Sequence, residues 1–249
     1  MALTPDTLTF DTADPVRVAT FWAASLDFKL EDPDPGGTFV LDPTGRSRGL
    51  FFQPVPEPKI VKNRVHLDLR APTTMAAEVE RMRELGAHEI RFVDEGHGSW
   101  PVMGDPEGNE FCVLRGVGEG AKRDRPGFDS LVIDCDDWRM VADFWMAALG
   151  YRELGAGTSG AEIIGSRDGD PMMSLVHVPE PKTVKNRIHL DVRPDDSMAA
   201  EVARVEALGA TQRGFIEVEG SFWTQMRDPE GNEFCVLRGP DDGWSPDEL

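Results

Sequence analysis

The sequence contains a histidine–aspartate pair twice, in two nearly identical segments. VHLDLR carries His66 and Asp68, and IHLDVR carries His189 and Asp191. Imidazole titrates near neutral pH, which suits either histidine to act as a general base or to contact a ligand. Residues two apart in a strand share a face, and each pair is therefore expected on one surface.

Each pair also has a structural interpretation. A histidine on such a face can be held by a hydrogen bond to a neighbouring side chain. Asp68 and Asp191 can form ion pairs with Arg70 and Arg193, which follow two residues later on the same face. We expect these ion pairs, and the sequence leaves both interpretations of the histidines open.

A cysteine recurs in the same way, as Cys112 and Cys235 within DPEGNEFCVLRG. A thiol becomes a nucleophile when a nearby cation or helix N-terminus lowers its pKa, and without such a group an inert strand cysteine is the favoured interpretation. The third cysteine, Cys135, has Thr12 as its counterpart. An odd number of cysteines without a disulfide spacing indicates reduced thiols and a cytoplasmic protein.

These residues belong to a duplication of the whole chain. VPEPKIVKNRVHLDLR begins at Val55 and returns as VPEPKTVKNRIHLDVR at Val178, 123 residues later. FWAASL at Phe21 and FWMAAL at Phe144 keep the same displacement. We predict a first module over 1–116, a linker over 117–127, a second module over 128–240 and a frayed tail over 241–249.

Each module is expected to contain a strand, a helix and three strands, and then the same order again. Asp14 and Pro15 mark the start of the first helix, and Gly86 marks the end of the second. Strands are indicated by alternation between turn residues, at 8–11, 38–42, 49–53, 64–70, 88–93, 99–103 and 110–115, then at 131–134, within 151–176, and at 187–193, 211–218, 222–226 and 233–238.

Two further repeated segments are interpreted as structural. The basic residues Lys59, Lys62 and Arg64 could attract an anionic substrate, but we favour a role in holding the proline-rich connector. In the DPEGNEF turn, Pro106 presets one turn dihedral and Gly108 permits a positive one.

The composition is that of a globular protein, with 40% hydrophobic and 29% charged residues. A formal net charge of −19 opposes binding to nucleic acid or to an anionic membrane. No apolar run approaches the roughly 18–20 residues that cross a bilayer, and MALTPDTLTF lacks the features of a signal peptide. We expect a cytoplasmic monomer or homodimer with a small-molecule ligand and no nucleic-acid or membrane partner.

The alternation gives each module one aliphatic face and one polar face. Because helices must cover the aliphatic face, the polar face is suited to a concave ligand-binding surface. Trp100 and Trp223 match across the repeat and would either stack on a planar ligand or pack in the core. The candidate ligand-binding residues are Thr7, Gln53, His66, Asp68, Trp100, Cys112, Ser130, His189, Asp191, Trp223 and Cys235.

The duplicated strand–helix–three-strand halves, the HLDL strand and the DPEGNEF turn resemble the vicinal oxygen chelate superfamily, which includes glyoxalase I, extradiol dioxygenases and bleomycin-binding proteins. The PKxVKNRxHLD segment is similar to glyoxalase-like domains found in tandem in bacteria. The resemblance implies an α+β fold of two tandem modules. Each module would pair two βαβββ units into a curved mixed sheet with helices on its outer face.

The resemblance also implies a divalent metal, such as Zn, Fe, Mn or Ni, bound by His, Glu or Gln from the first, fourth, fifth and eighth strands. The first-strand positions are Thr7 and Ser130, which are not usual ligands. The remaining matches in the first module are Gln53, His66 and Cys112. Because module two lacks the glutamine, we expect an incomplete metal site, with Gln53, His66 and Cys112 as the ligand set if a metal binds.

The function expected from this resemblance is binding of a small organic molecule in one or both cups, with His66 and His189 as candidate bases. Two alternatives stay open. One is a metal-dependent lyase, isomerase or dioxygenase. The other is a resistance protein that sequesters a drug-like compound.

Overall fold

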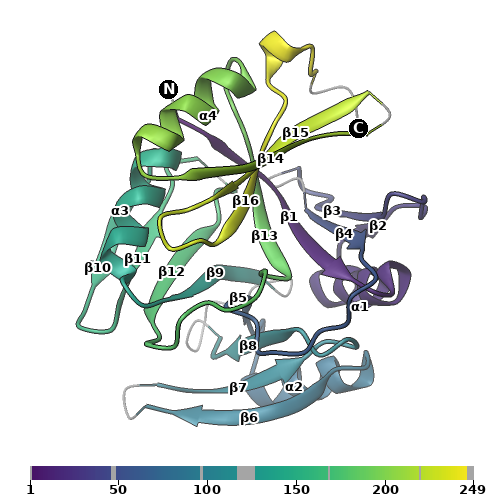
Figure 1. Cartoon of the computed structure of the whole chain (residues 1–249). Coiled ribbons are helices and arrows are strands. Elements are labelled where there is room, and N and C mark those ends of the chain that lie inside the picture. Colours follow the sequence, from purple (N-terminus) through teal and green to yellow (C-terminus); the bar gives the residue numbers. More distant parts are fainter. Residues whose placement is uncertain are drawn as a thin grey trace. The chain divides into compact units, whose positions relative to one another are not determined.

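The computed structural model describes residues 2–45, 49–95, 98–116, 127–167, 169–218 and 220–245. Most of the predicted linker, residues 117–126, and the end of the predicted tail, residues 246–249, lie outside the described residues. The described part forms two eight-stranded mixed sheets and four α-helices, which confirms the predicted α+β fold of two tandem modules (Figure 1).

The elements follow the predicted order closely. In the first module they are β1 (Thr4–Thr12), α1 (Pro15–Leu26), β2 (Lys29–Leu30), β3 (Thr38–Leu41), β4 (Leu50–Pro54), β5 (Val65–Arg70), α2 (Met75–Glu84), β6 (His88–Asp94), β7 (Ser99–Gly104) and β8 (Glu110–Leu114). In the second they are β9 (Gly127–Cys135), α3 (Trp138–Leu149), β10 (Arg152–Ala156), β11 (Gly160–Ile164), β12 (Met172–His177), β13 (Ile188–Arg193), α4 (Met198–Ala207), β14 (Thr211–Val218), β15 (Ser221–Arg227) and β16 (Glu233–Leu237). The two-residue β2 was not located from the sequence because it is too short to show alternation.

The strands are ordered β14-β15-β16-β13-β1-β4-β3-β2 in one sheet and β10-β11-β12-β9-β5-β8-β7-β6 in the other. By its internal contacts the chain divides into two compact units. Residues 9–132 form the amino-terminal unit, which includes the first part of β9 beside β5. Residues 1–8 with 133–249 form the carboxy-terminal unit, which includes the first part of β1 beside β13.

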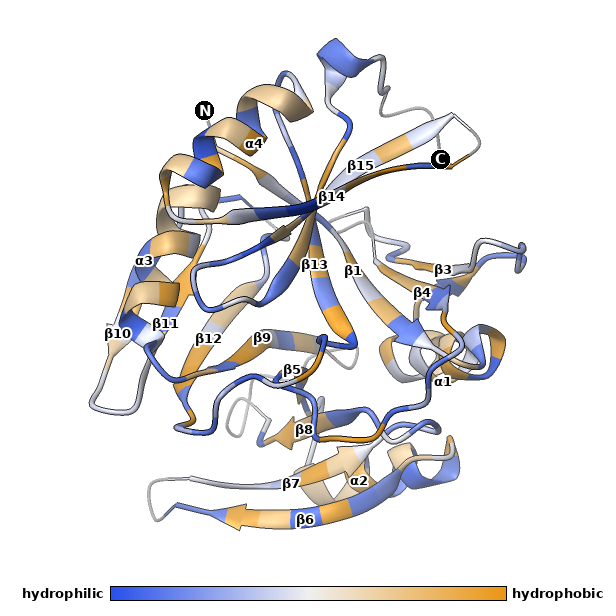
Figure 2. Ribbon diagram, in the orientation of Figure 1, coloured by the Kyte–Doolittle hydropathy of each residue, from blue (hydrophilic) through white to orange (hydrophobic). Residues whose placement is uncertain are grey.

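The helices cover the aliphatic side of the strands within each unit. Helix α1 lies against β3 and β4, and α3 lies against β11 and β12 (Figure 1). Hydrophobic and hydrophilic residues alternate along β13 (Figure 2), as the sequence predicts for a strand with one face covered. The largest buried side chains of the amino-terminal unit's core are aromatic, namely Phe10, Trp22, Phe52 and Phe111.

The helix ends use the residues expected from the sequence. The Asp14 carboxylate accepts a hydrogen bond from the Arg17 backbone N–H, and Pro15 occupies the first helical position of α1. Gly86 follows α2 with a φ of +109°, a conformation that a side chain would disfavour. Within the described residues, no helix is long and apolar enough to cross a membrane.

The DPEGNEF turn is confirmed as a structural device. The buried Asp105 carboxylate accepts hydrogen bonds from the backbone of Glu107 and Asn109, at 2.9 Å each. Its second oxygen accepts the Trp22 indole N–H at 3.1 Å. Gly108 has the expected positive φ of 84°. The turn therefore fixes the first helix to the start of β8.

The basic connector is also structural in its main contacts. Lys59 Nζ lies 2.9 Å from Glu110 Oε1, and the backbone N–H of Asn63 donates to Glu110 Oε2 at 3.0 Å. The Asn63 amide donates to Asn109 Oδ1 at 3.0 Å. The repeat keeps all three contacts, between Lys182, Asn186, Asn232 and Glu233.

The described part of the tail does not fray as predicted. Pro240–Asp242 forms a short 3-10 helix. The Asp242 carboxylate accepts the backbone N–H of Met198, at the start of α4, at 2.7 Å. The Arg193 guanidinium lies 4.0 Å from the centre of the Trp244 ring. These polar and cation–π contacts, which the charged composition of the tail did not reveal, hold it on the carboxy-terminal unit.

Candidate functional site

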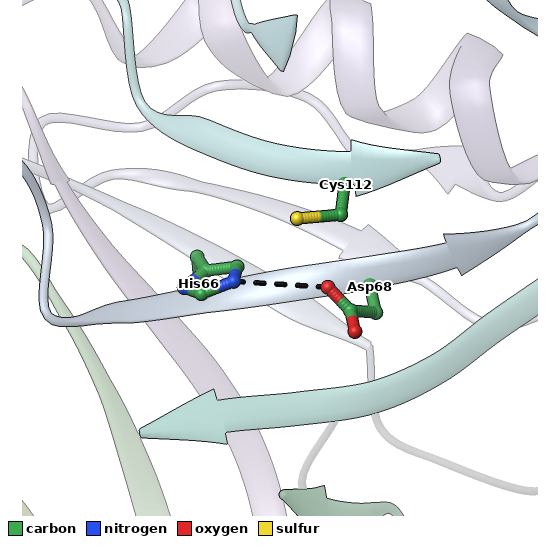
Figure 3. Close-up of side chains that lie close together, drawn as sticks. All are labelled: His66, Asp68 and Cys112. Atoms are coloured by element: carbon green, nitrogen blue, oxygen red, sulfur yellow. Dashed lines mark ion pairs between the residues drawn. The ribbon is translucent and has the colours of Figure 1, made fainter. Parts of the chain in front are cut away.

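Three side chains with different chemistry converge in the amino-terminal unit. His66 and Asp68 lie on β5 and Cys112 lies on β8, and one potential ligand atom of each lies within 4.8 Å of the others. Figure 3 shows the Cys112 sulfur pointing toward the other two side chains. His66 Nε2 lies 3.7 Å from Asp68 Oδ1. We call this group the His66 cluster.

The strand pairing explains this convergence. Strands β5 and β8 are parallel neighbours, and their register sets Asp68 opposite Cys112. In β5 the aliphatic residues are buried while His66, Asp68 and Arg70 are partly exposed on the other face, as the alternation predicts. The Cys112 side chain is buried, whereas the side chains of His66 and Asp68 are 12% and 16% exposed to solvent. The cluster is therefore accessible from solvent through its polar members.

Burial dominates the electrostatics of the His66 cluster. It raises the pKa of Asp68 to about 7, although hydrogen bonds from Cys112 and Ser130 favour the carboxylate. Burial, followed by the nearby Asp68 charge, raises the pKa of the Cys112 thiol well above its usual range. Cys112 is therefore a protonated hydrogen-bond donor rather than an activated nucleophile.

The predicted pairing of Asp68 with Arg70 is wrong. Arg70 instead forms a two-pronged ion pair with Asp129 on β9, with nitrogen–oxygen distances of 2.5 and 2.6 Å. In the same way Arg193 pairs with Asp6 on β1, at 2.8 Å. Both arginines thus contact a strand contributed by the other module. Asp68 interacts with the thiol, Ser130 and the histidine, and the charge of Arg70 lowers its pKa by a smaller amount.

Ser130 lies beside the His66 cluster although it belongs to the second module in sequence. Strand β9 neighbours β5 in the sheet, and this pairing brings Ser130 within hydrogen-bonding reach of Asp68. Thr7 occupies the corresponding position on β1, which neighbours β13, and its hydroxyl donates to Asp6 at 3.0 Å. The sequence pattern predicts each residue beside the histidine of its own module, because strand pairing between modules is not visible in the repeat.

The duplication produces a second group of the same composition in the carboxy-terminal unit. His189 and Asp191 on β13 and Cys235 on β16 offer ligand atoms within 4.8 Å of one another, and we call them the His189 cluster. His189 Nε2 lies 3.4 Å from Asp191 Oδ1. Asp191 faces Cys235 in the parallel register of the two strands. His189 and Cys235 are buried, and the Asp191 side chain is 13% exposed to solvent.

The predicted ligand set of Gln53, His66 and Cys112 is not assembled on one sheet. Gln53 lies on β4, whereas His66 and Cys112 lie on strands of the other eight-stranded sheet. The prediction took the four strand positions from one module and assumed that its two halves form one sheet. The third donor beside His66 and Cys112 is Asp68, which the predicted metal-ligand set does not contain.

The two tryptophans lie on the polar faces that carry the clusters. Val102 on β7 is opposite Cys112 on β8, and Trp100 is two residues before Val102 on the same face. Trp223 on β15 has the matching position relative to Cys235. Both tryptophan side chains are half-buried. Whether they stack on a ligand remains a prediction.

Each cluster has donors that fit a divalent transition metal. Imidazole nitrogen, carboxylate oxygen and thiolate sulfur are all ligands of zinc, and their mutual distances require little rearrangement. In the His66 cluster, a bound cation would also offset the cost of ionising two buried acids, Asp68 and Cys112. The site therefore passes a chemical test for the metal that the resemblance implies.

Comparison with known proteins agrees with this architecture. The sequence matches the glyoxalase-like domain family over residues 7–114 and again over 130–237. No curated protein matches the sequence.

Solved structures share the fold at low identity. A proposed dioxygenase from Bacillus subtilis is 15% identical with a TM-score of 0.69, over 96% of this chain and 86% of that one. Glyoxalase I from Zea mays is 14% identical with a TM-score of 0.68, over 96% and 94%. The cppA protein from Streptococcus pneumoniae is 14% identical with a TM-score of 0.51, over 95% and 98%. These likenesses support the fold, and the two family matches show that the chain belongs to the glyoxalase-like domain family.

Proposed function

We propose that the protein binds a small organic molecule on the polar sheet face of each unit, in contact with the His66 and His189 clusters. The observation that carries the proposal is the convergence of an imidazole, a carboxyl and a thiol on one face, twice. Trp100 and Trp223 lie on the same two faces and would supply a planar contact surface. We also propose a cytoplasmic location, on the basis of the three free cysteines.

The chemistry of the His66 cluster suits a ligand with both donor and acceptor groups. Near neutral pH Asp68 is poised between its protonated and ionised forms, because burial raises its pKa to about 7. His66 Nε2 lies 3.7 Å from that carboxyl, beyond hydrogen-bonding distance, and is placed to exchange a proton with a bound molecule. Cys112 contributes a fixed thiol donor and an apolar surface.

A second candidate function is that of a metal-dependent lyase, isomerase or dioxygenase. The three donor atoms within 4.8 Å favour it, because catalytic metal sites typically use three protein ligands and leave a position open. In that case the His, Asp and Cys of a cluster would hold the ion, and the metal would supply Lewis-acid polarisation of a substrate oxygen. The residues around it would bind the substrate and orient it.

A ligand screen on protein treated with EDTA tests the primary proposal. Planar aromatic and carboxylic compounds are added to the wild-type protein, and ligands are detected by a rise in melting temperature. For ligands of the amino-terminal unit we expect the rise to be lost in His66→Ala, and for ligands of the carboxy-terminal unit in His189→Ala. His88→Ala, at an exposed position on β6, is the matched control and keeps both. Ligands that stabilise all variants equally would contradict the proposal.

A further inference from the structure

The faces around the two clusters differ at one position opposite the cysteine. Val102 is opposite Cys112 in the antiparallel register of β7 and β8, whereas Gln225 is opposite Cys235 in the register of β15 and β16. Side chains directly opposite each other have Cβ atoms roughly 4.5–5.5 Å apart, a separation that a glutamine amide can span. Gln225 is thus within reach to bring an amide oxygen to the His189 cluster, whereas the His66 cluster has the isopropyl group of Val102 opposite its cysteine.

The same faces differ in charge one strand further out. Arg91 on β6 is opposite Val102, on the face that carries Cys112. Its positive charge acts on the Cys112 thiol. The corresponding residue on β14 is Gly214, opposite Gln225. Arg213 and Arg227 of that unit lie 3.8 and 3.7 Å from the Glu233 carboxylate, which also pairs with Lys182 at 2.9 Å. The amide donor of Gln225 is therefore the difference that favours the His189 cluster as the cation site.

From these differences, we propose that the His189 cluster binds a divalent transition metal with Gln225 as its fourth ligand, and that the His66 cluster does not. The set His189, Asp191, Cys235 and Gln225 departs from the superfamily pattern, because Asp191 follows the fifth-strand histidine by two residues and Gln225 comes from the seventh strand of its module. The inference rests on the proposed function in one respect only, that the clusters are the ligand-contacting parts of the faces.

Charge balance supports this assignment. Binding requires Cys235 to release its thiol proton to solvent, after which the thiolate and the Asp191 carboxylate neutralise the two positive charges of the ion. Histidine and glutamine add donors without adding charge. A buried site that is electrically neutral avoids the cost of an uncompensated charge.

Titration with cobalt(II) chloride tests the assignment, because a thiolate ligand gives cobalt(II) a charge-transfer absorption band. We expect the wild-type protein to bind a single equivalent of cobalt with this band. The band is expected to persist in Cys112→Ser and to disappear in Cys235→Ser. Gln225→Val is expected to weaken cobalt binding at least about tenfold, the size of effect typical for residues that support a metal.

Reciprocal variants provide the controls. Gln225→Val places at position 225 the residue that the other module already has there, which makes it compatible with the fold. The double variant Arg91→Gly, Val102→Gln copies the His189 face onto the amino-terminal unit and is expected to bind a second equivalent. Circular dichroism and melting temperature establish that each variant is folded.

Four outcomes would overturn the inference. They are no cobalt binding to the wild-type protein, a band that follows Cys112, equal binding at both clusters, and an unchanged affinity in Gln225→Val. Failure here is separable from failure of the proposed function, since the small-molecule screen uses metal-free protein. Ligand binding by the metal-free protein at the histidines, together with no cobalt binding at the His189 cluster, would overturn the inference and leave the proposed function standing.

Discussion

The Cys112 thiol and the Asp68 carboxyl lie opposite each other on adjacent parallel strands and share a hydrogen bond in which the thiol is the donor. The pair is buried on one side and open to solvent at Asp68. Its protonation state therefore affects both the stability of the fold and the chemistry of the polar face. His66, Ser130, Asp129 and Arg70 surround the pair and modulate it.

The first prediction concerns stability and pH. Burial raises the pKa of Asp68 from 3.8 to about 7, so that between these values the folded state holds a proton that the unfolded chain has lost. The contribution of Asp68 to stability is full below about pH 4 and is lost as the pH rises through 7. Asp68→Asn removes this dependence, which we expect to amount to roughly 2–4 kcal/mol.

Urea unfolding of the wild-type protein and of Asp68→Asn at pH 5 and pH 8 provides the measurement. The free energy of unfolding of the variant should fall less between the two pH values than that of the wild type. Equal decreases in the two proteins would show that Asp68 titrates normally in the folded state.

The second prediction concerns thiol reactivity. Because burial raises the pKa of Cys112, the native protein should resist alkylation by iodoacetamide at pH 8 at this residue. All three cysteines are buried and free, and all should react rapidly once urea unfolds the chain. Mass spectrometry of digested samples locates the label. Rapid labelling of Cys112 in the folded protein would contradict the hydrogen-bonded thiol.

The third prediction concerns the repeated turn. Asp105→Ala leaves the indole N–H of Trp22 and the backbone N–H groups of Glu107 and Asn109 without their acceptor in the core. Unsatisfied buried donors are costly, and we expect a loss of about 3 kcal/mol in unfolding free energy. Asp228→Ala should cost a similar amount, because Asp228 accepts the same bonds from Trp145, Glu230 and Asn232. A loss below about 1 kcal/mol in both variants would show that the network contributes little.

The fourth prediction separates the two interpretations of the connector. Lys59→Met leaves Glu110 charged and buried without its ammonium partner, and should destabilise the fold by about 1–3 kcal/mol. Ligand affinity should not change, because the lysine is engaged by Glu110. The double variant Lys59→Met, Glu110→Gln should recover part of the lost stability. A single variant of normal stability that loses ligand affinity would restore the anion-binding interpretation.

Local sequence signals predicted most of the fold. The cap formed by Asp14 and Pro15, the alternation in VHLDLR and the glycine in DPEGNEF each set local structure through nearby residues. The constant displacement of 123 residues then carried most assignments from one module to the other, and the strands within 151–176 were not located individually. The common face of His66 and Asp68 was predictable for the same reason.

The partners of the site residues were not predictable, because they depend on which strands become neighbours. Pairing of β5 with β9 brings Ser130 to Asp68 and Asp129 to Arg70, across a sequence separation of about 60 residues. The repeat gave no preference between pairing within a module and pairing across modules. The grouping of Gln53 with His66, which lie on different sheets, follows from that ambiguity.

The most direct test of the central claim follows the histidine side chains by NMR as a ligand from the screen is added to metal-free protein. The account predicts that the imidazole resonances of His66 or His189 shift in a saturable manner. Those of His88 and His177, which are exposed and outside both clusters, should stay in place. A ligand that binds without moving the resonance of either cluster histidine would contradict the account.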